Sequence, residues 1–192
     1  ASTRLESAVE WAIEQEADTY SMSFLIPNLG EYRSHWRKVM EHGSFCGVYF
    51  VSGAGNFARQ VATPIQMRTP EDIPEVVFAA AGIQRNFSRT VFSSKGPVKW
   101  ETQHYHDGLI QKPEVCAFNS GLPVLLLNGK AVPSGLNGNS FAGPMFCGSI
   151  ALMLSADPDL LPWDLKEIIT STATDVGKPG VDPETGYGLI NC

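Results

Sequence analysis

The stretch GNSFAGPMFCGSIALMLS, residues 138–155, contains no charged residue and is rich in Gly, Ala, Ser and Cys. This pattern predicts a buried helix over about 139–155, in which small side chains allow close packing through the centre of the domain. Pro144 lies near the helix start, where a lost backbone hydrogen bond is least damaging. Ser140 lies at the helix N-terminus, where free N–H groups and the helix dipole favour negative charge. This position suits a nucleophile.

The segments on either side of this helix alternate between helical periodicity and short apolar runs. Such alternation is typical of a parallel sheet covered on both faces, so we expect an α/β fold in one domain, 1–192. The expected helices cover 3–17 with a capping box of Thr3 and Glu6, 31–43 closed by Gly43, and 162–172. The expected strands cover 19–26, 45–56, 74–82, 115–118 and 123–127, with a short one at the end of the chain.

Composition and charge exclude several classes of function. The chain has 192 residues, is 43% hydrophobic and carries a net charge of −6. It has no apolar run of membrane-spanning length and no Lys/Arg cluster, so we expect neither a membrane span nor a nucleic-acid partner. The four cysteines, Cys46, Cys116, Cys147 and Cys192, show no CxxC spacing, which argues against zinc. Three of the four lie in apolar runs, and we interpret them as small buried thiols.

A second candidate element is VSGAGN, residues 51–56, where a strand runs into a glycine turn. The amide of Asn56 could donate a hydrogen bond to an oxyanion. The overlapping segment 53–58 also resembles a dinucleotide-binding fingerprint, with Glu71 and Asp72 near the distance expected for its acidic residue. The segment that follows contains two prolines and no helical periodicity, so we favour the oxyanion interpretation.

The four histidines offer few candidates for a catalytic base. His35 and His42 fall on the outward side of the second predicted helix, among basic residues. His104 and His106 alternate in WETQHYHDG, a loop that also contains Asp107, and this alternation places both imidazoles on one side of an extended segment. We interpret this group as polar loop decoration, with a metal site and a replacement base as the alternatives.

Several segments, in order along the chain, resemble those of the subtilases, the subtilisin-like serine proteases. GNSFAGP (138–144) is similar to their serine motif Gly-Thr-Ser-Met-Ala-x-Pro, with Asn139 for threonine and Phe141 for methionine, and VSGAGN is similar to the segment that carries their oxyanion asparagine. The other segments that resemble the family are SAVEWAIEQEADTYSMSF (7–24), FSSKGP (92–97), KPEVCAF (112–118) and TGYGLIN (185–191).

The resemblance implies a set of site residues. Ser140 would be the nucleophile, and the Asn56 amide and the Ser140 backbone N–H would hold the oxyanion. The substrate would be a peptide or protein that pairs as an added strand, and no cofactor is implied. Leu25 stands where the family usually has glycine, which would reshape the pocket for the residue before the scissile bond. The cleft residues implied are Ser23, Phe24, Leu25, Gly53, Ala54, Gly55, Gly138 and Asn139.

The resemblance also implies that the catalytic Asp and His come before the first helix of this sequence. We therefore expect the C-terminal portion of a three-layer subtilisin-like domain, incomplete at its N-terminal side and with little activity alone. The missing portion or self-association would cover its apolar face. Secretion is usual for the family, although ASTRLESAVE (1–10) lacks the apolar core of a signal peptide. The alternatives are a non-catalytic peptide-binding module and a nucleotide-binding α/β protein.

Overall fold

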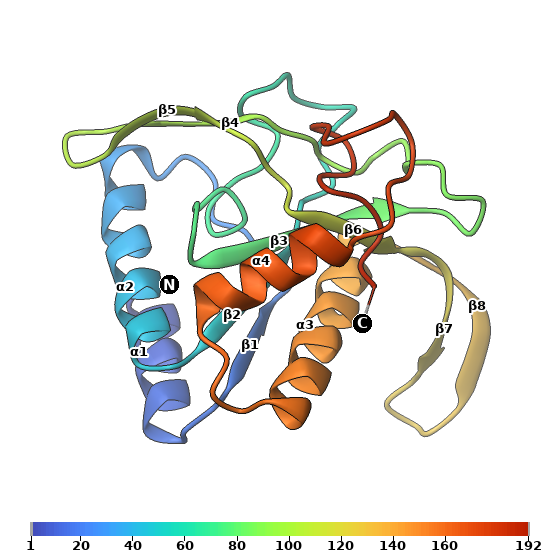
Figure 1. Ribbon diagram of the computed structural model, residues 1–192, viewed down its shortest axis with the longest axis horizontal. Coiled ribbons are helices and arrows are strands. Elements are labelled where there is room, and N and C mark those ends of the chain that lie inside the picture. Colours follow the sequence, from blue (N-terminus) through green and yellow to red (C-terminus); the bar gives the residue numbers. More distant parts are fainter. Residues whose placement is uncertain (1, 192) are drawn as a thin grey trace.

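A parallel sheet lies at the centre of the computed structural model, which describes residues 2–191 and their side chains other than those of Ser2, Thr3 and Ser134 (Figure 1). Within that part of the chain the sheet has four strands, in the spatial order β1-β2-β3-β6. β2 and β3 are buried along their full length, because helices cover both faces. The strands are β1 (Thr19–Met22), β2 (Tyr49–Gly53), β3 (Val77–Ile83) and β6 (Val115–Phe118).

Alternate side chains of the sheet enter two separate cores. On one face, α1 (Ser2–Glu14) and α2 (Arg33–Phe45) cover the sheet, with α2 preceded by the short 3-10 helix η1 (Gly30–Tyr32) (Figure 1). Trp36 of α2 packs in this core with Phe50 of β2, and both side chains are fully buried. The apolar side of the amphipathic helix α2 thus faces the sheet.

On the other face, α3 (Asn139–Ala156) and α4 (Pro162–Thr172) cover the sheet (Figure 1). Phe146 of α3 packs in this second core with Val51 of β2, the neighbour of Phe50 in sequence. The two cores and the sheet between them make three layers, as the sequence predicted. None of the helices in residues 2–191 is both long and apolar enough to cross a membrane.

The small residues of α3 allow it to approach β2 closely at its first turns. A Cβ added to Gly143 would lie 2.8 Å from the Gly53 nitrogen, and one added to Gly53 would overlap the Asn139 carbonyl. The prediction that the whole helix is buried is wrong, because Gly148 faces open space and Leu152 is 65% exposed. Only the sheet-facing side of α3 is covered by described residues.

Two antiparallel hairpins extend the fold. The first pairs β4 (Val98–Glu101) with β5 (His106–Ile110), and the second pairs β7 (Ser120–Leu125) with β8 (Ala131–Asn137). The strand predicted over 123–127 therefore belongs to a hairpin outside the parallel sheet, and it starts earlier. β4, β5 and β8 were not predicted. In Figure 1 the β7–β8 hairpin projects away from the helices and the sheet.

Several predicted boundaries move in the structure. Strands 19–26, 45–56 and 74–82 become β1, β2 and β3, while the helices over 3–17 and 31–43 become α1 and α2. α2 continues through Gly43 because this glycine is packed against the Phe50 ring, 2.6 Å from where a Cβ would lie, and does not end the helix. Glu6 contacts Tyr32 and His35, and the Thr3 half of the predicted capping box lies outside the described side chains.

The end of the chain makes isolated bridges where a short strand was predicted. Leu189 pairs with Cys116 of β6 and with Thr174 after α4. Of the thiols, Cys116 is buried and Cys147 is half-buried, but Cys46 is exposed, so the prediction of a buried thiol is wrong there. Cys46 lies in the turn after α2, outside the part of the helix that packs on the sheet. Cys192 lies outside the described residues.

Candidate active site

A pocket of about 220 Å³ opens at the carboxyl ends of β1 and β2, beside the first turn of α3. The carboxyl end of a parallel sheet is where α/β folds usually bind ligands. The pocket is lined by Met22, Ser23, Phe24, Leu25, Ser52, Gly53, Gly55, Asn56, Phe57, Glu71, Asn139 and Ser140.

This lining contains all but two of the residues that the sequence suggested for the site. The exceptions are Ala54 and Gly138, which are buried and do not line the pocket. The Ala54 N–H donates to the Ala80 carbonyl of β3 at 2.8 Å, and the Gly138 N–H donates to the Asn119 carbonyl at 2.9 Å. The lining residues that were not predicted for a protease site are Met22, Ser52, Phe57 and Glu71.

Ser140 and Asn56 are both exposed at this pocket. The Asn56 Oδ1 accepts a hydrogen bond from the Asn139 backbone N–H at 3.0 Å. This bond directs the Asn56 Nδ2 donors away from Asn139. Ser23 Oγ donates to the Ser140 carbonyl at 3.2 Å, which ties the end of β1 to the start of α3. Among the described residues, no side chain is hydrogen-bonded to the Ser140 hydroxyl.

Asn139, directly before Ser140, is held by a dense set of hydrogen bonds although its side chain is only 1% exposed. Its Nδ2 donates to the Gly55 carbonyl at 2.6 Å and to Ser93 Oγ at 2.9 Å. Its Oδ1 accepts from Asn119 Nδ2 at 2.6 Å. A fully satisfied buried amide is rigid, because every alternative rotamer leaves polar groups unpaired. Asn139 therefore fixes the backbone that carries Ser140.

The same network continues below the site. Asn119 is fully buried, and its Nδ2 also donates to Thr90 Oγ1 at 2.9 Å. Ser93 Oγ accepts from the Gly82 N–H of β3 at 2.9 Å. Gly82 has no room for a Cβ, which would collide with the Asn119 amide. The network thus joins the helix start to the centre of the sheet. Sequence reasoning included Ser93 in a motif that resembles the family but found no role for it.

Glu71 is the charged side chain at this pocket. It is 1% exposed, and its Oε1 has no hydrogen-bond partner among the described residues. Burial raises the pKa of its carboxyl well above the ordinary value, Asp72 raises it further, and backbone N–H groups and Arg68 oppose the change. The sequence suggested Glu71 only for the dinucleotide fingerprint. The helix that this fingerprint requires is not observed, since residues 54–60 form turns and irregular structure.

The first pair of histidines lies as predicted, on the exposed side of α2. The prediction that the side of α2 around these histidines is exposed to solvent is wrong at Arg37, which is 7% exposed. Its guanidinium lies 3.9 Å from the centre of the Tyr105 ring and forms an ion pair with Asp107, so the β4–β5 hairpin covers it. Neither His35 nor His42 lines the pocket.

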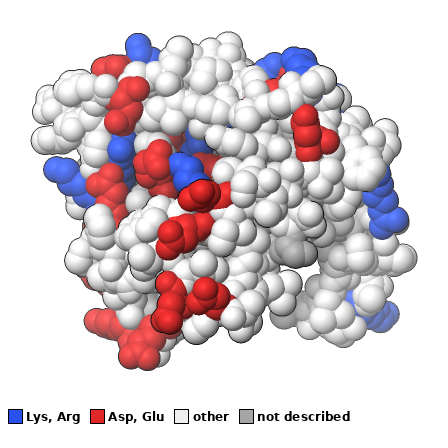
Figure 2. Space-filling model, viewed as in Figure 1, with Lys and Arg blue, Asp and Glu red and all other residues white. Residues whose placement is uncertain are grey.

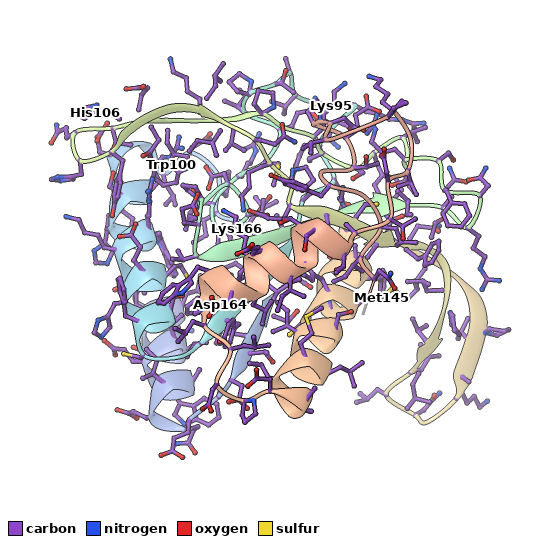
Figure 3. The ribbon with its side chains drawn as sticks, viewed as in Figure 1. Lys95, Trp100, His106, Met145, Asp164 and Lys166 are labelled. Carbon is purple, nitrogen blue, oxygen red and sulfur yellow. The ribbon has the colours of Figure 1, made fainter. Side chains whose placement is uncertain are left out.

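The second pair, His104 and His106, is exposed on the β4–β5 hairpin. The His106 Nδ1 lies 3.5 Å from Glu101 Oε2. No group of three possible metal ligands was found in the described part of the chain. Figure 3 places His106 at the outer edge of the molecule, far from Met145 in the second turn of α3. Neither histidine lines the pocket that contains Ser140.

Sequence comparisons find several related proteases. The chain is 28% identical over 191 residues to a probable subtilase-type serine protease of Deinococcus radiodurans, covering 95% of this chain and 25% of that protein. It is 26% identical over 185 residues to subtilisin DY of Bacillus licheniformis, covering 96% of this chain and 59% of that protein. The chain thus spans between a quarter and three fifths of the length of these two relatives.

Solved structures share the fold. The prenylagaramide maturation protease PagA superposes with a TM-score of 0.77 at 22% identity, over 100% of this chain and 65% of that chain. MycP1 with its N-terminal propeptide removed superposes with a TM-score of 0.76 at 22% identity, over 97% and 63%. The family model described as the subtilase family matches residues 2–188, nearly the whole sequence. This chain therefore belongs to the subtilase family of serine proteases.

Proposed function

We propose that the protein hydrolyses peptide bonds through an acyl-enzyme on Ser140. The observation that carries this proposal is that Ser140 and Asn56 line the same pocket, with the Asn56 Oδ1 bonded to the Asn139 N–H directly before Ser140. The Ser140 oxygen would attack the substrate carbonyl, and Asn56 Nδ2 and the Ser140 N–H would donate hydrogen bonds to the resulting oxyanion. The amine would then leave, and water would hydrolyse the ester.

The serine needs a base to take its proton and return it to the leaving amine. None of the four histidines lines the pocket, so we infer that the base and its orienting carboxylate come from outside residues 2–191. The open edge of β1 supports this inference, since within those residues β1 pairs with β2 alone. An unpaired strand edge invites another strand. It would come from another segment of the same protein or from a second copy.

A large groove at the opposite end of the sheet is a second reason to infer that another segment covers part of this chain. It has a volume of about 1260 Å³ and lies where the amino ends of β1 and β2 meet α3 and α4. Phe45, Leu161 and Trp163 line it and are all exposed. Figure 2 shows few charged side chains over α3 on the face in view, whereas charged side chains gather over the first turns of α4. Exposed apolar side chains that gather in a groove with a polar rim are typical of a contact region.

The peptide substrate would lie along the chain that leaves β1. Ser23, Phe24 and Leu25 follow that strand and line the pocket. An extended peptide beside them would receive backbone hydrogen bonds as an added strand. Leu25 is half-buried, so its side chain occupies space that a glycine would leave empty.

The proposal is tested with the complete gene product and a serine-directed fluorophosphonate probe. We expect rapid labelling and peptide hydrolysis, and loss of both in Ser140→Ala. The Asn56→Ala variant should retain labelling but lose about 100- to 1,000-fold in kcat, as expected for removal of one oxyanion donor. The 192-residue chain alone should label slowly. No labelling of the complete product, together with peptide binding that is unchanged in Ser140→Ala, would instead identify a peptide-binding module.

A further inference from the structure

The unpartnered oxygen of Glu71 lies at the pocket that contains Ser140. A Cβ built on Gly55, another lining residue, would lie 2.9 Å from Glu71 Oε1, so the oxygen lies directly against this glycine. Glu71 belongs to the loop before β3, whereas Gly55 follows β2. The fold therefore brings a buried acid from a distant part of the sequence to the wall of the candidate substrate pocket.

No described cation forms an ion pair with this acid. Arg68 is the cation that affects it, but its guanidinium lies over the Phe57 ring, 4.9 Å from the ring centre. Asp72 adds a second negative charge beside Glu71. A buried carboxylate without a partner is strongly unfavourable, which is why burial raises the pKa of the Glu71 carboxyl. A cation that entered the pocket would supply the missing partner.

The size of the pocket restricts what can enter. Pockets for drug-sized ligands have volumes of about 300–1,000 Å³, and this one has about 220 Å³. It therefore suits one side chain. Since Ser140 lines it, that side chain belongs to the residue whose carbonyl the serine attacks. Phe24, Leu25 and Phe57 provide apolar walls for an aliphatic stem.

We propose that Glu71 is a specificity-determining residue, which selects a Lys or Arg side chain immediately before the scissile bond. This inference rests on the proposed function of the site. The aliphatic stem of the substrate side chain packs between the apolar walls, and its charged end binds the Glu71 carboxylate. The carboxyl loses its proton to solvent when the cation binds. A substrate with an aliphatic residue at that position leaves Glu71 without a partner.

The inference is tested with the complete gene product and peptides that differ only at this position, as Lys, Arg, Gln or Leu. We expect kcat/KM to be at least about 10-fold higher for Lys or Arg than for Leu. Replacing Glu71 by Gln keeps the shape and removes the charge. It should lower kcat/KM for the Lys peptide by about 30-fold or more, the loss typical of a broken buried ion pair. The Leu peptide should change less than about 3-fold.

Two controls separate specificity from folding. Glu75→Gln removes a nearby exposed carboxylate that pairs with Lys166, and should leave the Lys:Leu ratio unchanged. Thermal unfolding of Glu71→Gln checks that this variant is folded. Glu71→Asp is a second variant, which keeps the carboxylate but moves it back from the pocket by one methylene group, and we expect an intermediate Lys:Leu ratio. An unchanged ratio in folded Glu71→Gln, or no preference for Lys or Arg in the original protein, overturns the inference.

Binding measurements keep this inference separate from the proposed function. Calorimetry with the Ser140→Ala variant should show tighter binding of the Lys peptide than of the Leu peptide, and the additional Glu71→Gln change should remove the difference. If no peptide is hydrolysed by the original protein, the proposed function fails, and these binding data still decide the role of Glu71. Equal binding of both peptides to Ser140→Ala overturns the inference whether or not hydrolysis occurs.

Discussion

Glu114 and Glu71 are both buried acids, but their surroundings differ. Glu114, at the start of β6, accepts hydrogen bonds from Lys112 Nζ at 2.8 and 2.9 Å and from the Ala79 N–H of β3 at 2.7 Å. Lys112 is fully buried and also donates to the Val77 carbonyl of β3. Glu71 has an oxygen with no described partner. The closed ion pair therefore connects β3 to the segment before β6, whereas the open acid lies at the wall of a pocket, where we propose that it binds a substrate side chain.

The largest effect is expected when the cation of the Lys112–Glu114 ion pair is removed. Lys112→Met would leave the Glu114 carboxylate buried without its cation, and we expect a loss of about 3–5 kcal/mol in the free energy of unfolding. Urea denaturation of the complete gene product measures it. Lys166→Met is the matched control, because Lys166 makes an exposed pair with Glu75 at the same 2.8 Å separation and should change stability by less than about 1 kcal/mol. Similar losses in both variants would contradict the comparison.

A second prediction concerns the buried amide network that holds the residue before Ser140. Asn119→Ala removes the donor to Asn139 Oδ1 and should cost about 1–3 kcal/mol in stability, because it leaves buried polar groups unpaired. It should also lower kcat while KM stays similar, since the start of α3 would be less well fixed. Asn128→Ala, in an exposed turn, is the control. An unchanged kcat would show that the network does not position the nucleophile.

A third prediction concerns how the stability contributed by Glu71 depends on pH. The pKa of Glu71 is raised in the fold, so the native state retains a proton that the unfolded state loses above about 4.5. Stability should therefore fall as the pH rises from about 4.5 towards the raised pKa. Glu71→Gln removes this decline, so thermal unfolding of the two proteins should differ more at pH 7 than at pH 4. Parallel curves would show that Glu71 titrates normally.

The smallest effect concerns the thiols. Burial raises the pKa of Cys116 to about 12, whereas Cys46 is exposed. Iodoacetamide should modify Cys46 well before Cys116 in the folded protein, as peptide mass spectrometry would show. Cys46→Ser should change stability by no more than about 0.5 kcal/mol. Equal rates at the two thiols would mean that β6 opens readily, against the closed environment described for Glu114.

The layers of the fold and much of the site could be predicted because their signals are local. Pro162 marks the first residue of α4, and the apolar run VCAF matches β6 residue for residue. The small-residue run begins at Asn139, where α3 starts, and the serine and asparagine motifs led to the pocket. These features depend on residues adjacent in sequence, so periodicity and motif resemblance suffice to find them.

The features that were not predicted depend on tertiary contact. β8 contains a proline and a glycine, and it forms through its pairing with β7. The amides of Asn119 and Asn139 meet only because the end of β6 and the start of α3 lie side by side. Glu71 resembles any polar loop residue until the fold buries it. The periodicity of apolar residues along the chain carries no information about contacts between residues that are distant in sequence.

The parallel order of the sheet also affects how fast it can form. Thr19 pairs with Tyr49, Phe50 with Val77 and Ala80 with Val115, so paired residues lie roughly thirty positions apart in the chain. Each pairing requires closure of a long loop before any ladder hydrogen bond forms, and sheets dominated by such non-local pairs fold in milliseconds to seconds. Newly made chains therefore leave the residues of the Ser140 pocket unpacked for much longer than the chain of a helical bundle stays unfolded.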